Sequence, residues 1–281
     1  MTRDVKGATP GLSIRFWGVR GSIPVSGGDY VRFGGDTICF EVKLGDERFI
    51  VDAGSGLRRL GGAMVEDGDM NATLLLTHFH LDHIIGLTGF EVLRSPAARI
   101  QIHAPAFGSC DVRSCLARLL GEPFFPVALD RMRGIRACSD FELGTTLAIG
   151  CHRIRTVRLN HGGGACGYRF DHAGKALAII TDHEHRDAAH EEALADFCQG
   201  ADLIVYDAMW DESVDYDPHR GWGHSSWQAG LRLLRKANAR RLACVHHAPT
   251  HTDDMLEHRE EELQRQHASS FCARQDLYVV L

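Results

Sequence analysis

Several features that define other classes of protein are missing from this chain. Its 281 residues contain no apolar run approaching the roughly 18 residues of a membrane-spanning helix. The nine cysteines are scattered singly, without the spacing of a disulfide framework or a paired zinc motif, which is typical of a reducing compartment. Residues 1–7 lack the apolar core of a signal peptide. We therefore expect a soluble cytoplasmic protein that does not engage a membrane.

Signatures of nucleic-acid and nucleotide-cofactor binding are also weak. The formal net charge is −6, and the nearest approach to a basic run is three arginines between residues 131 and 136, so we expect no long nucleic acid as a partner. Gly162, Gly164 and Gly167 spell G-x-G-x-x-G, but a strand-like segment follows them where dinucleotide binding requires a helix. We interpret these glycines as room for a close approach of the backbone.

The composition of the sequence and its uniformity along the chain indicate one domain over residues 1–281. It is 44% hydrophobic and 24% charged, with no repeat, no low-complexity tract and no flexible linker. Short strand-like segments come in antiparallel-looking groups with helices interspersed. Because both faces of such sheets need cover, we expect an α/β protein with two sheets back to back and helices outside.

The positions of these elements follow from apolar periodicity and from turn residues. One helix has a start signal, because Ser225 and Gln228 have the spacing of a capping box. The pattern is less regular between residues 104 and 140. We expect strands at 13–17, 37–43, 48–51, 74–76, 100–103, 146–150, 154–159, 167–171, 176–180, 203–206, 242–245 and 277–281, and helices at 57–64, 84–93, 112–120, 191–198, 225–237 and 253–266.

The most informative segment is Thr-His-Phe-His-Leu-Asp-His at residues 77–83, directly after an apolar stretch. His78 and His80 share one face of an extended chain and can point at one ion. If a helix begins after Leu81, Asp82 and His83 can reach a second ion. Imidazole with carboxylate suits zinc and neighbouring transition metals, so we interpret this segment as a metal site. The alternative is a polar turn that happens to be rich in histidine.

Three further candidate ligands follow later apolar strands. His161, Asp182 and His246 each stand at the end of such a strand, and a carboxylate at position 182 could bridge two ions. A single histidine at a strand end is more often structural, but three in order after the first motif favour a dinuclear site. His247 adjoins His246, and strand alternation favours His246 as the ligand, with His247 behind it or exposed.

With these motifs the sequence resembles the metallo-β-lactamase superfamily of hydrolases over nearly its whole length. The resemblance implies an αββα sandwich of two mixed β-sheets with helices on the outer faces and metals in a cleft at one edge. Asp52, before a glycine turn, matches a residue of that family that supports a ligand from behind. The resemblance assigns one ion to His78, His80 and His161, the other to Asp82, His83 and His246, and the bridge to Asp182.

Two features favour the phosphodiesterase branch, which includes ribonuclease Z and the phosphoribosyl cyclic phosphodiesterases. One is the pair Asp82 and His83 together with an aspartate at the bridging position. The other is Gly-Trp-Gly-His-Ser-Ser at residues 221–226, which resembles a segment whose histidine faces the substrate phosphate. His224 is therefore a candidate catalytic residue beside Asp182. The alternative for His224 is a simple turn before a helix.

The resulting prediction is a metal-dependent hydrolase, a phosphodiesterase that uses a hydroxide bridging two divalent ions. Zinc is the favoured metal, and manganese is the alternative. Only 20 residues separate His161 from Asp182, where many ribonuclease Z members insert an arm that grips tRNA. This spacing favours a small substrate, such as a cyclic nucleotide or cyclic sugar phosphate. Phe124 and Phe125 could stack on a base or form a core hairpin, and His185 could line the pocket.

Three alternatives stay open at this point. A lactonase or a glyoxalase II-like thioesterase would share the first motif but would not need the segment around His224. An RNA nuclease fits the ligands but not the short spacing, and a binding protein without catalysis would not need the full ligand set. The sequence does not decide between a monomer and a homodimer.

Overall fold

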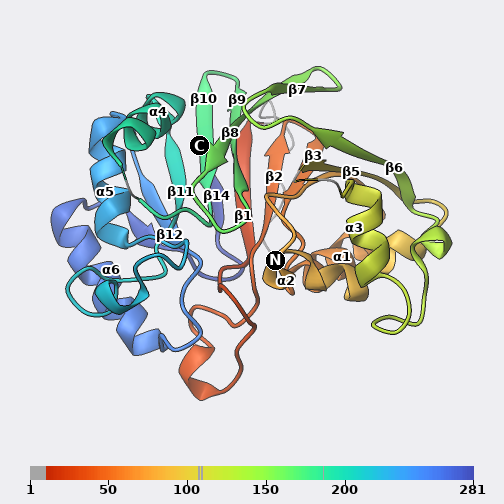
Figure 1. Ribbon diagram of the computed structural model, residues 1–281, viewed down its shortest axis with the longest axis horizontal. Coiled ribbons are helices and arrows are strands. Elements are labelled where there is room, and N and C mark those ends of the chain that lie inside the picture. Colours follow the sequence, from red (N-terminus) through yellow and green to blue (C-terminus); the bar gives the residue numbers. More distant parts are fainter. Residues whose placement is uncertain (1–10, 107, 109, 186) are drawn as a thin grey trace.

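Two seven-stranded sheets lie back to back, with helices on the outer face of each (Figure 1). The computed structural model describes residues 11–106, 108, 110–185 and 187–281. The expectation about a signal segment, and the first ten residues of the expected domain, lie outside these ranges. The arrangement confirms the predicted αββα sandwich, with α1, α2 and α3 on one side and α4, α5 and α6 on the other.

The first sheet has the strand order β14-β1-β2-β3-β4-β5-β6. Its β14-to-β3 half is antiparallel, and β3 to β6 run parallel, so the sheet is mixed. Its strands are β1 (Leu12–Gly18), β2 (Cys39–Leu44), β3 (Glu47–Val51), β4 (Asn71–Leu75), β5 (Arg99–Pro105), β6 (Ile135–Phe141) and β14 (Tyr278–Val280).

The second sheet has the order β13-β12-β11-β10-β9-β8-β7. Strands β10 to β13 are parallel, and β7 to β10 are antiparallel. Its strands are β7 (Thr146–Ile149), β8 (His152–Leu159), β9 (Ala165–His172), β10 (Lys175–Ile180), β11 (Leu203–Asp207), β12 (Leu242–Val245) and β13 (Phe271–Cys272).

Six α-helices and five 3-10 helices are formed by the described residues. No helix within the described ranges is long and apolar enough to cross a membrane. The α-helices are α1 (Leu57–Glu66), α2 (Leu81–Ile84), α3 (Val112–Leu119), α4 (Ala188–Cys198), α5 (Trp227–Lys236) and α6 (Asp253–Gln266), and the 3-10 helices are Gly28–Tyr30, Ile85–Gly89, Glu91–Arg94, Leu129–Arg131 and Asp217–His219.

Several predicted details differ from the structure. The helix expected at 84–93 is wrong, because α2 ends at Ile84 and two 3-10 helices follow. A Cβ at Gly86 would lie 1.9 Å from the carbonyl oxygen of Gly54, so tight packing on that turn decides the local conformation. Strands β6 and β13 were not predicted, since β6 is partly exposed without an apolar run and β13 has only two residues. Helix α5 is capped by Ser226, whose side chain accepts from the Ala229 amide, one residue later than expected.

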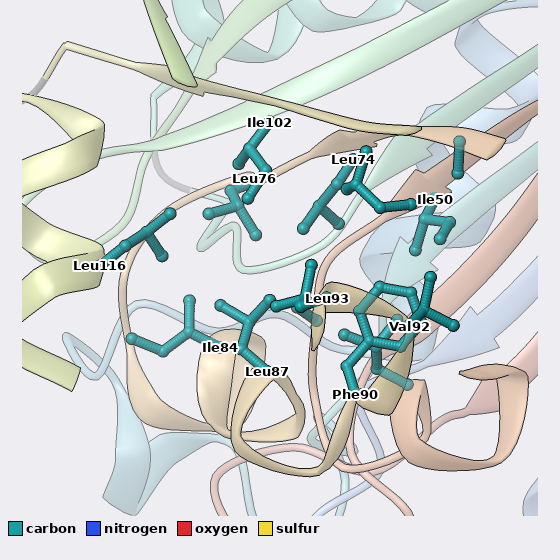
Figure 2. Packing of buried hydrophobic residues seen from close by; sticks show 14 of the residues in the cluster. Ile50, Leu74, Leu76, Ile84, Leu87, Phe90, Val92, Leu93, Ile102 and Leu116 are labelled. Atoms are coloured by element: carbon teal, nitrogen blue, oxygen red, sulfur yellow. The ribbon is translucent and has the colours of Figure 1, made fainter. Parts of the chain in front are cut away.

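Alternate residues of the central strands are buried in different clusters. Leu74 and Leu76 pack toward the helices of the first sheet, where Figure 2 shows them with Ile50 opposite Phe90. Leu75 packs between the two sheets. A third cluster lies between the second sheet and its helices. Burial on both faces explains the continuous apolar runs of these strands.

Candidate metal centre

The seven expected ligands come from five segments that meet at this edge. Residues 78 and 80 lie in the loop after β4, and residues 82 and 83 lie in α2. The other three directly or closely follow β8, β10 and β12. The structure brings together the side chains of all seven: His78, His80, Asp82, His83, His161, Asp182 and His246.

One half of the centre is formed by three histidines whose donor atoms converge. His161 Nε2 lies 3.0 Å from His80 Nδ1, and the nitrogens of His78, His80 and His161 lie within 4.8 Å of one another. His161 donates its Nδ1 hydrogen to the carbonyl of Gly223 at 2.8 Å, which leaves Nε2 for the centre. Asp182 Oδ2 lies 3.8 Å from His78 Nε2 and 3.7 Å from His161 Nε2.

The other half contains a carboxylate and two histidines. His246 Nε2 is 3.2 Å from Asp82 Oδ2, and His83 Nε2 is 3.4 Å from the same oxygen. Asp182 Oδ1 lies 3.1 Å from His83 Nε2 and 3.4 Å from His246 Nε2. The two oxygens of Asp182 therefore face two different donor groups.

The electrostatics of the two halves differ. Burial lowers the pKa of His78, His80 and His161, so near neutral pH these imidazoles keep free lone pairs. Burial would raise the pKa of Asp182, but His246 and His83 outweigh it and hold that pKa well below its usual range. Burial would likewise raise the pKa of Asp82, but His83 and His246 outweigh it and lower that pKa. Both carboxylates of the centre are thus ionised near pH 7.

The residues present fit a divalent cation. His78 Nε2 and His83 Nε2 are buried and have no hydrogen-bond partner, although both face the carboxylate of Asp182. A buried polar atom left without a partner costs about 1–3 kcal/mol, and a coordinated ion would satisfy such atoms. Nitrogen and oxygen donors without sulfur suit zinc and its neighbours among the transition metals.

Asp52 holds one ligand in place from behind. Its carboxylate accepts hydrogen bonds from the Thr77 amide at 2.7 Å and from His83 Nδ1 at 2.8 Å. This bond directs His83 Nε2 toward the centre, as expected of a carboxylate that orients a metal ligand. Burial raises the pKa of Asp52, although the nearby His83 opposes the shift.

Strained backbone is concentrated at the same edge. Asp52, Asp182 and His246 have φ values of 61°, 55° and 60°, in the left-handed region. Ser22, with φ 63°, donates its amide hydrogen to Asp82 Oδ2 at 2.7 Å. Such conformations cost about 1–3 kcal/mol each and are typical of functional sites.

Residues 47–247 match the family described as the beta-lactamase superfamily domain. The chain belongs to this family. Its fold implies divalent metal ions, and with the histidine and aspartate groups described above it identifies the protein as a metal-dependent hydrolase.

The similarity to individual relatives covers more of the chain than the family match does. Ribonuclease Z of Natronomonas pharaonis is 21% identical in an alignment 298 positions long, which covers 86% of this chain and 89% of the relative. Among solved structures, the metallo-beta-lactamase fold protein YhfI from Bacillus subtilis has a TM-score of 0.72 at 16% identity and covers 95% of this chain and 99% of its own. A diphosphatase from the PhnP family has a TM-score of 0.67 at 18% identity, with 96% and 98% covered. These structural similarities support the superfamily fold.

His224 lies beside the centre and is held by a residue that the sequence analysis missed. Its Nδ1 donates to Asp207 Oδ2 at 2.9 Å, and its ring stacks on that of His246 with centroids 4.7 Å apart. Burial lowers the pKa of His224, but Asp207, Asp182 and Asp82 outweigh it and raise the pKa to about 9. Asp207 ends the apolar strand β11, the same pattern that singled out Asp182, so this signal was present in the sequence.

A second missed carboxylate shapes the loop before His224. Glu184 is buried and accepts hydrogen bonds from the amides of Gly221 and Gly223 at 2.5 and 3.0 Å. Both glycines have positive φ, at 91° and 87°. No local pattern in the sequence indicates this role, because the contact joins segments nearly 40 residues apart.

The four remaining candidates lie in different surroundings. His247 is fully buried, so the expected exposed position is wrong: it donates from Nε2 to the Ala273 carbonyl at 2.9 Å and packs edge-on against Phe33. His185 Nδ1 lies 2.7 Å from the Ser225 hydroxyl. The other two separate, since Phe124 is 78% exposed whereas Phe125 packs against the cluster in Figure 2.

Gly21 allows His246 its position in this centre. A Cβ at residue 21 would lie 2.3 Å from His246 Cε1 and Nδ1, so Gly21→Ala must displace the imidazole. We expect the zinc affinity of the centre to fall about 10–100-fold, as for other changes behind a ligand. Competition with a chelator, with hydrolase activity reporting occupancy, measures this.

The matched control is Gly62→Ala in α1, where a Cβ meets nothing within 4 Å. It should keep the zinc affinity and stabilise the helix by about 0.5–1 kcal/mol. An unchanged affinity in Gly21→Ala would show that His246 does not hold metal in this position.

Proposed function

We propose that the protein is a phosphodiesterase that uses two divalent ions. Zinc is the preferred metal for both, and manganese is the alternative. The observation that carries the proposal is the division of Asp182 between the two donor groups, with Oδ2 toward His78 and His161 and Oδ1 toward His83 and His246. A carboxylate in this position would bridge the ions. The ligands would be His78, His80 and His161 for one ion, and Asp82, His83 and His246 for the other.

When bound, two such ions lower the pKa of a water molecule and offset the charge that develops on a phosphate. Asp182 would orient the attacking oxygen. His224 carries a proton near pH 7, since Asp207 and the neighbouring carboxylates raise its pKa to about 9 despite burial. Because Asp207 occupies Nδ1, the Nε2 hydrogen is left to donate to a phosphate oxygen or to the leaving oxygen.

The surroundings of His224 favour an anionic substrate. It stands three residues before Trp227, the first residue of α5, and the amide end of a helix carries a partial positive charge. Lactones and thioesters do not carry a phosphate and do not require such a donor. The arrangement of His224, Asp207 and α5 therefore supports phosphodiester over carboxylic ester hydrolysis.

Substrate size follows from the segment between His161 and Asp182. The structure fills it with the hairpin of β9 and β10, joined by a turn at residues 173–174, so this interval contains no arm for gripping tRNA. We therefore propose a small, cyclic phosphodiester, such as a cyclic nucleotide or a cyclic sugar phosphate. The exposed ring of Phe124 is available to stack on a base.

An RNA substrate is the second candidate. It is favoured by the curated relatives, which are named ribonuclease Z in Natronomonas pharaonis, Archaeoglobus fulgidus and Pseudomonas putida. Both candidates require cleavage of a phosphorus–oxygen bond at the same centre. They differ in how the rest of the substrate is held.

A substrate panel tests the reaction class. We expect metal-loaded protein to turn over cyclic nucleotides and bis-aryl phosphates faster than lactones and thioesters by orders of magnitude. The reason is that only the first two carry a phosphate to which His224 would donate. Small cyclic diesters should also exceed tRNA precursors in kcat/KM. Efficient turnover of lactones or thioesters alone would overturn the proposal, and a preference for RNA would replace the small substrate with a nuclease substrate.

Metal content tests the role of Asp182. Asp182→Ala should lose at least one equivalent of zinc relative to the unchanged protein, because its oxygens lie against both donor groups. Asp171→Asn is the control, since this carboxylate is half exposed on β9 and should leave the content unchanged. Equal metal content in Asp182→Ala and the unchanged protein, measured by elemental analysis, would remove Asp182 from the bridge.

His224→Ala separates a catalytic donor from a ligand. We expect kcat and kcat/KM to fall together by about 10²–10³, with unchanged metal content and melting temperature. His258→Ala, an exposed histidine on α6, serves as the control and should retain full activity. Loss of metal in His224→Ala would make it a ligand, and unchanged activity would reduce it to a turn residue.

A further inference from the structure

A second group of potential metal ligands lies at the opposite end of the sandwich. Glu47 is the first residue of β3, Cys151 is the last residue of the turn between β7 and β8, and His152 is the first residue of β8. The other ends of these two strands lead to Asp52 and His161 in the metal centre. Figure 1 accordingly shows β7 far from α2.

The donor atoms of this group form a nearly regular triangle. Cys151 Sγ lies 3.6 Å from His152 Nε2 and 3.8 Å from Glu47 Oε1, and the nitrogen and oxygen lie 3.4 Å apart. The last distance exceeds the roughly 2.7–3.2 Å of a good N–H···O hydrogen bond. Zinc bonds of about 2.3 Å to sulfur and 2.0–2.1 Å to nitrogen and oxygen, at tetrahedral angles, give edges of about 3.6 Å and 3.4 Å. The triangle thus has the dimensions of one face of a zinc tetrahedron.

A nucleophilic Cys–His–Glu relay fits the same residues poorly. In such a relay the thiol and the carboxylate contact opposite nitrogens of the imidazole, so that one accepts a proton while the other is oriented. Here Cys151 and Glu47 both approach Nε2 of His152. Convergence on one point is the geometry of coordination.

The surroundings hold the ligands while leaving them accessible. The His152 ring packs edge-on against Phe49, with centroids 5.7 Å apart, and its side chain is 9% exposed. Glu47 and Cys151 are exposed. Gly150 has φ 57°, and a Cβ there would lie 3.2 Å from Glu47 Oε2, so the glycine both makes the turn and leaves space for the carboxylate.

We propose that Glu47, Cys151 and His152 bind a further zinc ion, with water in the fourth position. Binding would release the thiol proton of Cys151 to solvent. Because Glu47 belongs to the first sheet, and His152 and the turn residue Cys151 belong to the β7–β8 hairpin of the second, the ion would join the two sheets at the end remote from the hydrolytic centre. This site is independent of the proposed phosphodiesterase activity.

Cobalt(II) titration of the full-length protein tests the proposal. The ligands of the hydrolytic centre include no sulfur, so a thiolate-to-cobalt charge-transfer band would report a cysteine ligand. We expect the band in the unchanged protein and its loss in Cys151→Ser, together with one equivalent less of bound zinc and unchanged hydrolase activity. The comparison is repeated in a Cys110→Ser background, because Cys110 Sγ lies 3.0 Å from that of Cys115 and this pair could also bind cobalt. In that background the band should still be present and should still be lost on Cys151→Ser.

No band in the Cys110→Ser background, or a band in that background that persists after Cys151→Ser, would overturn the proposal. Alkylation provides a second measurement, because a metal-bound thiolate is a poor nucleophile. One added equivalent of zinc, beyond that filling the hydrolytic centre, should slow iodoacetamide labelling of Cys151 by about tenfold or more. Glu47→Gln and His152→Ala should reduce this protection, and equal labelling rates with and without zinc in the unchanged protein would contradict it.

Discussion

The carboxylate of Asp182 is the interaction on which the edge of the sandwich depends. It is buried and ionised, and it contacts histidines from four different segments. A buried negative charge is tolerated only when surrounding groups compensate it. The positions of β4, β8, β10, α2 and β12 at this edge are therefore coupled through one side chain, and the left-handed backbone of Asp182 directs it toward them.

Much of the fold and most of the centre could be predicted because their signals are local. An apolar strand that ends in a ligand can be recognised from a few neighbouring residues, as at His161 and Asp182. The carboxyl ends of strands that run in the same direction lie at one edge of the sheet, so ligands that each follow such a strand are expected to cluster.

What could not be predicted depends on contacts between distant segments. The helix expected at 84–93 is interrupted where Gly86 packs on Gly54, and Glu184 acts on a loop far along the chain. Strand alternation already favoured His246 over His247 as the ligand, but the bond from His247 to the Ala273 carbonyl depends on a segment 26 residues away. Glu47 and Cys151 are more than 100 residues apart, so neither suggests a site until the two sheets are packed.

The burial of β4 on both faces has a consequence for how the chain finds its alignment. Leu74, Leu75 and Leu76 are all apolar, so sliding this strand by one position would exchange faces with little loss of hydrophobic burial. The bonds from Thr77 to Asp52 exist in only one alignment. The polar residues at the end of the strand thus specify the register of β4 against β3. The same hydrogen bonds that position the metal centre therefore also favour the correct strand pairing.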